Sequence, residues 1–246
     1  MFLHFRILFY SLVFFVGLEM IAMKQGLIFP VVIILTVFSL WGAKKIGGRW
    51  LFSIIPVTFP FSSIAMLYLI DLTYGKQVFV FLGTLMYYLS LLGAYRLNNY
   101  SKDQTARGMI LASAATTLFF FYTAAYGIYL NFLVPLWQLM IFFLLVTVFV
   151  SYQDLMITKR SSRKLVWSYS ILLGMIMAEF AWVMNFWPFG YLTTGVIALI
   201  FYYVLWDLAQ SYFLNLLSRK RVVANMILFT FLVSLVLVSS RWLPTI

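Results

Sequence analysis

The stretch from Leu165 to Leu217 decides the fold, because it consists of two apolar runs joined by the turn Asn185-Phe186-Trp187-Pro188-Phe189-Gly190. It is preceded by Lys159-Arg160-Ser161-Ser162-Arg163-Lys164 and followed by Ser218-Arg219-Lys220-Arg221. Both flanks are basic, and the turn between the runs carries no charge. This pattern is typical of two membrane-spanning helices whose basic loops face the cytosol and whose uncharged turn faces the other side.

The composition extends this interpretation to the whole chain. Of the 246 residues, 65% are hydrophobic and only 9% are charged. A soluble domain of this length could not bury so much apolar surface, so the sequence predicts an integral membrane protein without a separate soluble domain. The net charge of +11 comes from residues in short loops beside the spans, where it meets anionic lipid headgroups. We therefore expect the lipid bilayer as a partner, and no nucleic acid.

The rare residue types exclude several chemistries. The chain has no cysteine and a single histidine, His4, at its N-terminus. Disulfides, thiolate chemistry, cysteine-based zinc sites and Ser-His-Asp triads are therefore excluded. The sequence also lacks a Gly-rich phosphate loop and the HExxH and GxSxG motifs. We expect no cofactor and no metal site, and we assign no catalytic residue.

The apolar runs predict an all-α bundle of about nine transmembrane helices in a single domain of residues 1–246. We interpret the first run as a retained span, because Met20-Ile21-Ala22 does not match the small-x-small pattern of a signal-peptide cleavage site. The predicted spans cover residues 7–23, 27–43, 50–70, 78–95, 108–130, 136–158, 165–184, 191–217 and 222–243.

The basic residues predict the orientation of the bundle. With nine spans, 14 of the 17 Lys and Arg residues fall on the side that holds the N-terminus. The positive-inside rule places that side in the cytosol and the C-terminus outside. The short loops favour a cell membrane, and we expect the inner membrane of a bacterium.

Three carboxylates within predicted spans are candidate ligand or proton sites, since a charge in hydrocarbon costs at least about 2.5–3.5 kcal/mol. Glu179 lies about 9 Å from the outer turn and Asp207 about 24 Å from it, so we expect no pairing between them. No basic residue is predicted deep in a span, so each is either a functional proton or headgroup site or a neutral clamp between helices. Asp154 matches Asp207 better in depth, and we interpret it as an ion-pair partner of Lys159 at the cytoplasmic rim.

Pro56 and Pro60 make the third span a further candidate. Each proline removes a helical hydrogen bond, so the span should kink or break. A broken helix can line a cavity that binds an ion or polar substrate, whereas a packed structural kink is the commoner result.

Elsewhere, small residues share one face at the spacing that predicts close helix packing: Gly174, Ala178 and Ala181 for span seven, and Gly190, Thr194 and Ala198 for span eight. The hairpins that begin at Gly108 and Leu165 resemble each other weakly, and Tyr87-Tyr88 and Tyr202-Tyr203 suggest a third copy of a parallel repeat. Equal membrane crossings also produce equal spacing, and this is the commoner explanation.

These observations leave three functional hypotheses. The first is a non-enzymatic membrane protein that binds a lipid or another apolar ligand, or that serves as a subunit beside another membrane protein. The second is a small proton-coupled secondary transporter that uses Asp207 and Glu179 beside the broken third span. The third is a membrane enzyme on lipid-like substrates, which the cytoplasmic loops disfavour because Asp103 is their only acidic residue.

Overall fold

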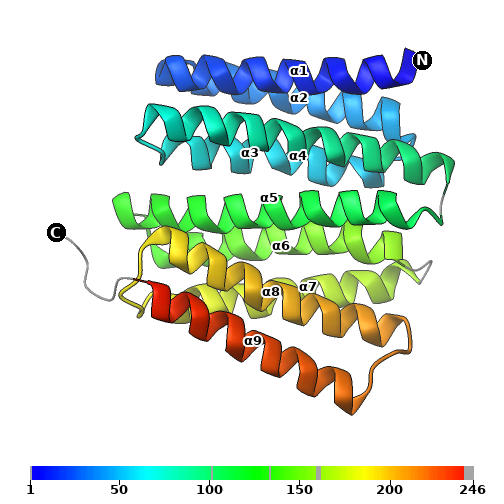
Figure 1. Ribbon diagram of the computed structural model, residues 1–246, viewed down its shortest axis with the longest axis vertical. Helices are drawn as coiled ribbons and strands as arrows, with labels where there is room; N and C mark the ends of the chain where they lie inside the picture. The colour runs from blue at the N-terminus through cyan, green and yellow to red at the C-terminus, as the bar shows by residue number, and fades with distance from the viewer. Residues whose placement is uncertain (1, 101, 133, 159–161, 241–246) are drawn as a thin grey trace. The chain divides into compact units, whose positions relative to one another are not determined.

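The computed structural model describes residues 2–100, 102–132, 134–158 and 162–240. Within these ranges the chain forms nine α-helices and two short 3-10 turns, with no strand. Figure 1 shows them as α1 (Phe2–Met23), α2 (Ile28–Gly47), α3 (Ile54–Tyr68), α4 (Thr73–Asn99), α5 (Gln104–Asn131), α6 (Leu136–Thr158), α7 (Arg163–Met184), α8 (Tyr191–Phe213) and α9 (Arg219–Ser239). The 3-10 turns are η1 (Gln25–Leu27) and η2 (Trp50–Ser53).

In the part of the chain that the structure describes, nine helices are long and apolar enough to cross a bilayer when η2 is counted with α3. The predicted number of long apolar helices is therefore confirmed, while several helices begin or end at other residues than the predicted spans. α4 begins at Thr73 and not at residue 78, and α9 covers Arg219–Ser239 and not 222–243. α8 ends at Phe213 and not at residue 217, since Asn215 adopts the left-handed φ of 56° that commonly ends a helix. Residues 159–161 and 241–246 of the predicted flanks lie outside the described residues.

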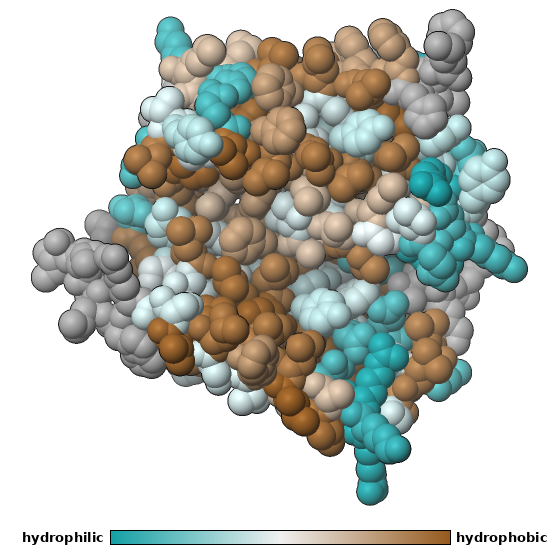
Figure 2. Space-filling model, in the orientation of Figure 1, coloured by the Kyte–Doolittle hydropathy of each residue, from teal (hydrophilic) through white to brown (hydrophobic). Residues whose placement is uncertain are grey.

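Large apolar side chains lie on the outside of the helices, and small hydroxyl groups lie inside. Phe29 and Val238 are 83% and 85% exposed, whereas Ser62 and Thr147 are fully buried. Figure 2 shows hydrophobic residues over the helices of the visible face, with hydrophilic residues gathered at helix ends such as the start of α9. Exposed apolar surface on this scale suits lipid and not water, so the helices indicate a membrane-embedded protein.

The chain packs as two compact units, residues 1–121 and 122–246, with the boundary inside α5. The single transmembrane domain expected for residues 1–246 therefore stays a prediction.

An aromatic cluster from α1, α3 and α4 forms the core of the first unit. Phe14 stacks on Tyr87 with ring centroids 4.4 Å apart, and Phe59 contacts both rings edge-on or tilted. The buried hydroxyl of Tyr87 lies 2.8 Å from that of Ser39 on α2. This hydrogen bond satisfies both hydroxyls in an apolar core and connects α2 to α4.

The connection between α4 and α5 is fixed by Asp103. Its carboxylate accepts hydrogen bonds from the Ala106 amide at 3.1 Å and from Nε of Arg96 at 2.7 Å. The amide of Ala106 and, after it, the Arg96 guanidinium hold the pKa of Asp103 below its usual value, against the opposing effect of desolvation. Asp103 therefore both caps α5 and pairs with α4.

Close helix approaches in the second unit depend on glycine. A Cβ atom at Gly174 of α7 would lie 2.9 Å from the carbonyl oxygen of Leu144 on α6, so only glycine allows this contact. Ala178 and Ala181 share the buried face, as the small-residue spacing predicts. Gly190 is exposed at the N-cap of α8 and has nothing near it, so its predicted packing role was wrong.

Candidate functional site

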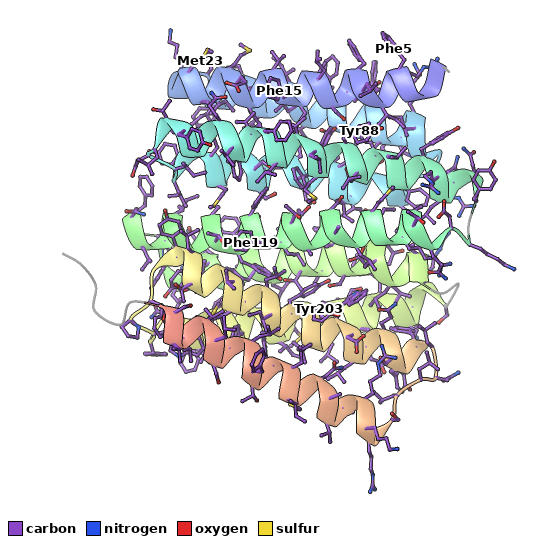
Figure 3. The ribbon with its side chains drawn as sticks, viewed as in Figure 1. Phe5, Phe15, Met23, Tyr88, Phe119 and Tyr203 are labelled. Carbon is purple, nitrogen blue, oxygen red and sulfur yellow. The ribbon has the colours of Figure 1, made fainter. Side chains whose placement is uncertain are left out.

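An open groove of about 700 Å³ lies between α1 and α4 in the first unit. Figure 3 labels Phe5 and Phe15 on α1 and Tyr88 on α4, which lie along it. The two helices are antiparallel, and beyond the groove Gln77 of α4 donates a 3.1 Å hydrogen bond to Glu19 of α1. The groove is lined by Phe5, Leu8, Phe9, Ser11, Leu12, Phe15, Phe81, Thr84, Leu85 and Tyr88.

The walls of the groove are suited to an apolar molecule. The hydroxyl of Ser11 donates to the Ile7 carbonyl at 3.0 Å, and that of Thr84 donates to the Val80 carbonyl at 2.7 Å. Both hydroxyls are thus satisfied by their own helices and need no polar ligand. Only Tyr88 adds a further polar atom to the lining, so an apolar chain could enter without burying an unsatisfied group.

Asp207 on α8 is held by α9, which corrects the sequence interpretation that no basic residue reaches it. Nη2 and Nε of Arg221 donate to the two carboxylate oxygens at 2.8 and 3.2 Å, and the amide of Asn225 donates at 2.8 Å. Asp207 lies six residues before the end of α8, and the long Arg221 side chain spans that distance. The carboxylate is therefore neutralised by a bidentate ion pair.

Asp154 on α6 is buried, with 3% of its surface exposed, and does not lie at an open rim as expected. It lies beside two hydroxyl contacts on the same face of α6. The hydroxyl of Thr147 is 2.6 Å from that of Tyr122 on α5, and that of Ser151 is 3.1 Å from that of Tyr202 on α8. Thr147, Ser151 and Asp154 follow helical spacing, so they form a buried polar column about 10 Å long. Lys159, its predicted partner, lies outside the described residues.

Glu179 lies on the exposed face of α7. The described residues that flank it on this face are apolar, and no described residue of the second unit donates a hydrogen bond to its carboxylate. Within this unit Glu179 therefore does not clamp two helices together, and its role as a proton or headgroup site stays a prediction. Glu179 and Asp207 do not pair, as expected from their depths.

Pro56 and Pro60 are both buried, and they act differently. Pro56 lies in the first turn of α3, after η2, where its missing amide costs no hydrogen bond. Pro60 lies inside α3, which continues to Tyr68 without a break. The hydroxyls of Thr58 and Ser62 donate to carbonyls of their own helix. The span is thus packed in the core of the first unit, and it does not contribute to the groove.

Sequence reasoning missed the groove because α1 and α4 are not consecutive. Hydropathy locates each span, but the pairing of distant spans leaves no mark in a single sequence. The small side chains of Ser11 and Thr84 within apolar runs are the one local signal, since they leave room between the larger residues. That signal is shared by many packing contacts, so it could not identify the groove alone.

The candidates thus form separate features: a groove in the first unit, and a polar column, an ion pair and an exposed carboxylate in the second. Among the described residues, no three His, Asp or Glu side chains gather as metal ligands would. No curated protein and no solved structure matches the chain. The family described as "Protein of unknown function (DUF5656)" matches residues 39–239, and the chain therefore belongs to this family.

Proposed function

We propose that the chain is a non-enzymatic, multi-spanning membrane protein that binds a lipid in the groove between α1 and α4. The observation that supports this proposal is the groove itself, about 700 Å³ of open space with apolar walls. Its lining offers one hydroxyl that is not already used by its own helix, so the ligand must be bound mainly through apolar contact. An acyl chain meets that requirement.

The length of the groove supports a lipid chain from one leaflet. Along α1 it extends from Phe5 to Phe15, about 15 Å, which is half of the roughly 30 Å hydrocarbon thickness of a bilayer. Arg6 is exposed and lies next to Phe5 at one end. A guanidinium at that position would attract an anionic headgroup while the acyl chain follows the groove.

The orientation of the bundle belongs to the same proposal. Because 14 of the 17 basic residues fall on the N-terminal side, we place the N-terminus in the cytosol and the C-terminus outside. We place the protein in a cell membrane, as the inner membrane of a bacterium. Arg6 would then lie at the cytoplasmic leaflet, where anionic lipids are enriched.

The test is native mass spectrometry of the chain purified from vesicles of equal parts phosphatidylglycerol and phosphatidylcholine. The variant Leu12→Trp fills the groove, and Leu235→Trp places the same ring on the exposed face of α9 as a matched control. We expect the wild type and the control to retain phosphatidylglycerol and the groove variant to lose most of it. Arg6→Gln should remove the preference for phosphatidylglycerol. Equal retention by both tryptophan variants would refute the proposal.

A proton-coupled transporter is the second candidate, and the buried Asp154 favours it. The carboxyl lies at one end of the polar column that includes Ser151 and Tyr202, and buried carboxyls within spans often carry protons. Proteoliposomes with a potassium gradient, valinomycin and an internal pH dye would measure proton entry. We expect Asp154→Asn to slow it and Asp71→Asn, which removes an exposed acid between α3 and α4, to leave it unchanged as the control. Equal rates for wild type and Asp154→Asn would remove this candidate.

A further inference from the structure

Glu179 differs from the other acidic residues of the chain. The chain has six Asp and Glu residues, and the structure describes them all. Only Glu179 lies on the exposed surface of a span without a hydrogen bond from another described residue. The remaining five lie in loops, are buried, or accept a hydrogen bond from a side chain: Asp71, Asp103, Asp154, Glu19 and Asp207.

The surface around Glu179 is otherwise apolar. Leu172 and Met175 precede it on the same face of α7 and are 51% and 50% exposed, and Trp182 follows it and is 48% exposed. The spacing of three and four residues is that of any straight helix face, and it is also the spacing through which two helices pack. The apolar residues on this face are what a surface in contact with lipid requires. The carboxylate of Glu179 is not, so its presence needs a separate explanation.

Lipid does not provide that explanation. Glu179 lies five residues before the end of α7 at Met184, about 7.5 Å along the helix, and the short Glu side chain cannot cover that distance to the headgroups. Carboxylates left in hydrocarbon are rare, and those that occur face a partner or a water-filled cavity. A partner that carries a positive charge at the same depth would satisfy Glu179.

We propose that the exposed face of α7 binds a transmembrane helix of another protein, and that Glu179 accepts hydrogen bonds from a Lys or Arg of that helix. The flanking side chains, Leu172, Met175 and Trp182, would supply the apolar contact on either side of the ion pair. A single polar residue in an apolar helix interface fixes register and partner choice, so Glu179 would also select the partner.

Within the second unit, no described Lys or Arg supplies the positive charge. Every Lys and Arg that the structure describes lies in a loop or within four residues of a helix end, whereas Glu179 lies five residues before the end of α7. Arg221, the best placed of these in the second unit, is already bound to Asp207. Lys76, in the first turn of α4, is the alternative that a second copy would supply, but its side chain would have to reach inward along α7, as Arg221 does toward Asp207. A basic residue of another protein at the depth of Glu179 needs no such reach, so charge complementarity favours that partner.

A designed helix tests this interface directly. The probe is a 23-residue Leu/Ala transmembrane peptide with one Lys about six residues from its outer end, a length that spans the bilayer. Its control carries Leu at that position. Energy transfer between labelled full-length protein and labelled peptide in phosphatidylcholine vesicles measures association. We expect the Lys peptide to bind the wild type about 3- to 30-fold more tightly than the Leu peptide.

Variants of the full-length protein distinguish binding through the ion pair from non-specific apolar association with the peptide. Glu179→Gln should abolish the preference for the Lys peptide, and Glu179→Lys should transfer it to a peptide with Glu at that position. Glu19→Gln, which removes an acid already bonded within the chain, should preserve it. Because Glu179 is exposed, both variants should keep the wild-type circular dichroism spectrum.

Three outcomes would overturn the proposal. The first is an equal preference in wild type and Glu179→Gln. The second is self-association of the chain that Lys76→Gln abolishes, which would assign the face to a second copy. The third is loss of the preference when phosphatidylethanolamine replaces half of the phosphatidylcholine, which would assign Glu179 to a lipid amine.

Discussion

Removing the ion pair between Asp207 and Arg221 should release α9 from the rest of the second unit. Within the described residues, α9 has one buried side chain, Asn225, and that side chain also donates to Asp207. Apolar packing of α9 is limited to half-buried side chains such as Phe229, whose ring centroid lies 5.8 Å from that of Phe201 on α8. We therefore expect the three hydrogen bonds to one carboxylate to supply a large share of what fixes α9. A double-mutant cycle with Asp207→Ala and Arg221→Ala measures the pair.

The structure sets the expected size of the coupling free energy. Hydrogen bonds to charged groups contribute about 1.5–3 kcal/mol each when well protected. The Arg221 side chain is 39% exposed and that of Asp207 14%, so water screens part of the interaction. We therefore expect a coupling of about 1–2 kcal/mol, between the value of a surface pair and that of a buried one.

The assay is reversible unfolding in mixed micelles of increasing SDS content, followed by circular dichroism. Lys220→Ala is the matched control, because Lys220 is adjacent to Arg221 and makes no contact with Asp207 in the structure. Its effect should add to that of Asp207→Ala within about 0.5 kcal/mol. If the Asp207–Arg221 coupling is also below about 0.5 kcal/mol, the reasoning that α9 is fixed through this carboxylate is wrong.

Three further perturbations test the packing. Gly174→Leu forces a side chain against a backbone carbonyl, so we expect a loss of about 1–3 kcal/mol in the same SDS titration. Tyr87→Phe should cost about 1 kcal/mol by leaving the Ser39 hydroxyl unpaired, and adding Ser39→Ala should recover part of that loss. The lowered pKa of Asp103 stabilises the fold above its unfolded pKa of about 4, and this contribution is lost as the pH falls through the folded pKa. In the variant Asp103→Asn, Arg96 lacks an anionic partner. The free energy of unfolding of this variant should therefore depend less on pH between 3 and 6 than that of the wild type.

The span pattern could be predicted from sequence because it depends on a bulk property. A helix must present about 20 apolar residues to cross a bilayer, and basic residues must remain at its ends. These requirements act on every residue of a segment, so single exceptions such as Pro60 do not obscure them. The nine predicted spans reflect this averaging, whereas individual limits, such as the end of α8 at Phe213, depend on the conformation of one residue.

The neighbours of each side chain could not be predicted in the same way. Asp207 was predicted to lie about 24 Å from the turn that precedes α8, which puts it near the C-terminal end of its helix. Arg221 lies in the first turn of α9, the next helix along the chain, so the sequence already indicated that the two residues have similar depth. The prediction was wrong because it looked for a basic partner only deep within a span. The long side chain of Arg221 reaches Asp207 from the end of its own helix.

The exposure of Glu179 could have been predicted from the sequence. Its distance from the end of the span did not indicate it, but the positions of its neighbours on the helix do. Gly174, Ala178 and Ala181 mark the face of α7 that packs against its neighbours. At 3.6 residues per turn, Glu179 points between about 100° and 160° away from each of them. A carboxylate opposite a small-residue face points away from the helices that pack on that face. The same test applies to any span with a small-residue face, and it separates carboxylates that serve the chain's own packing from those available to another molecule.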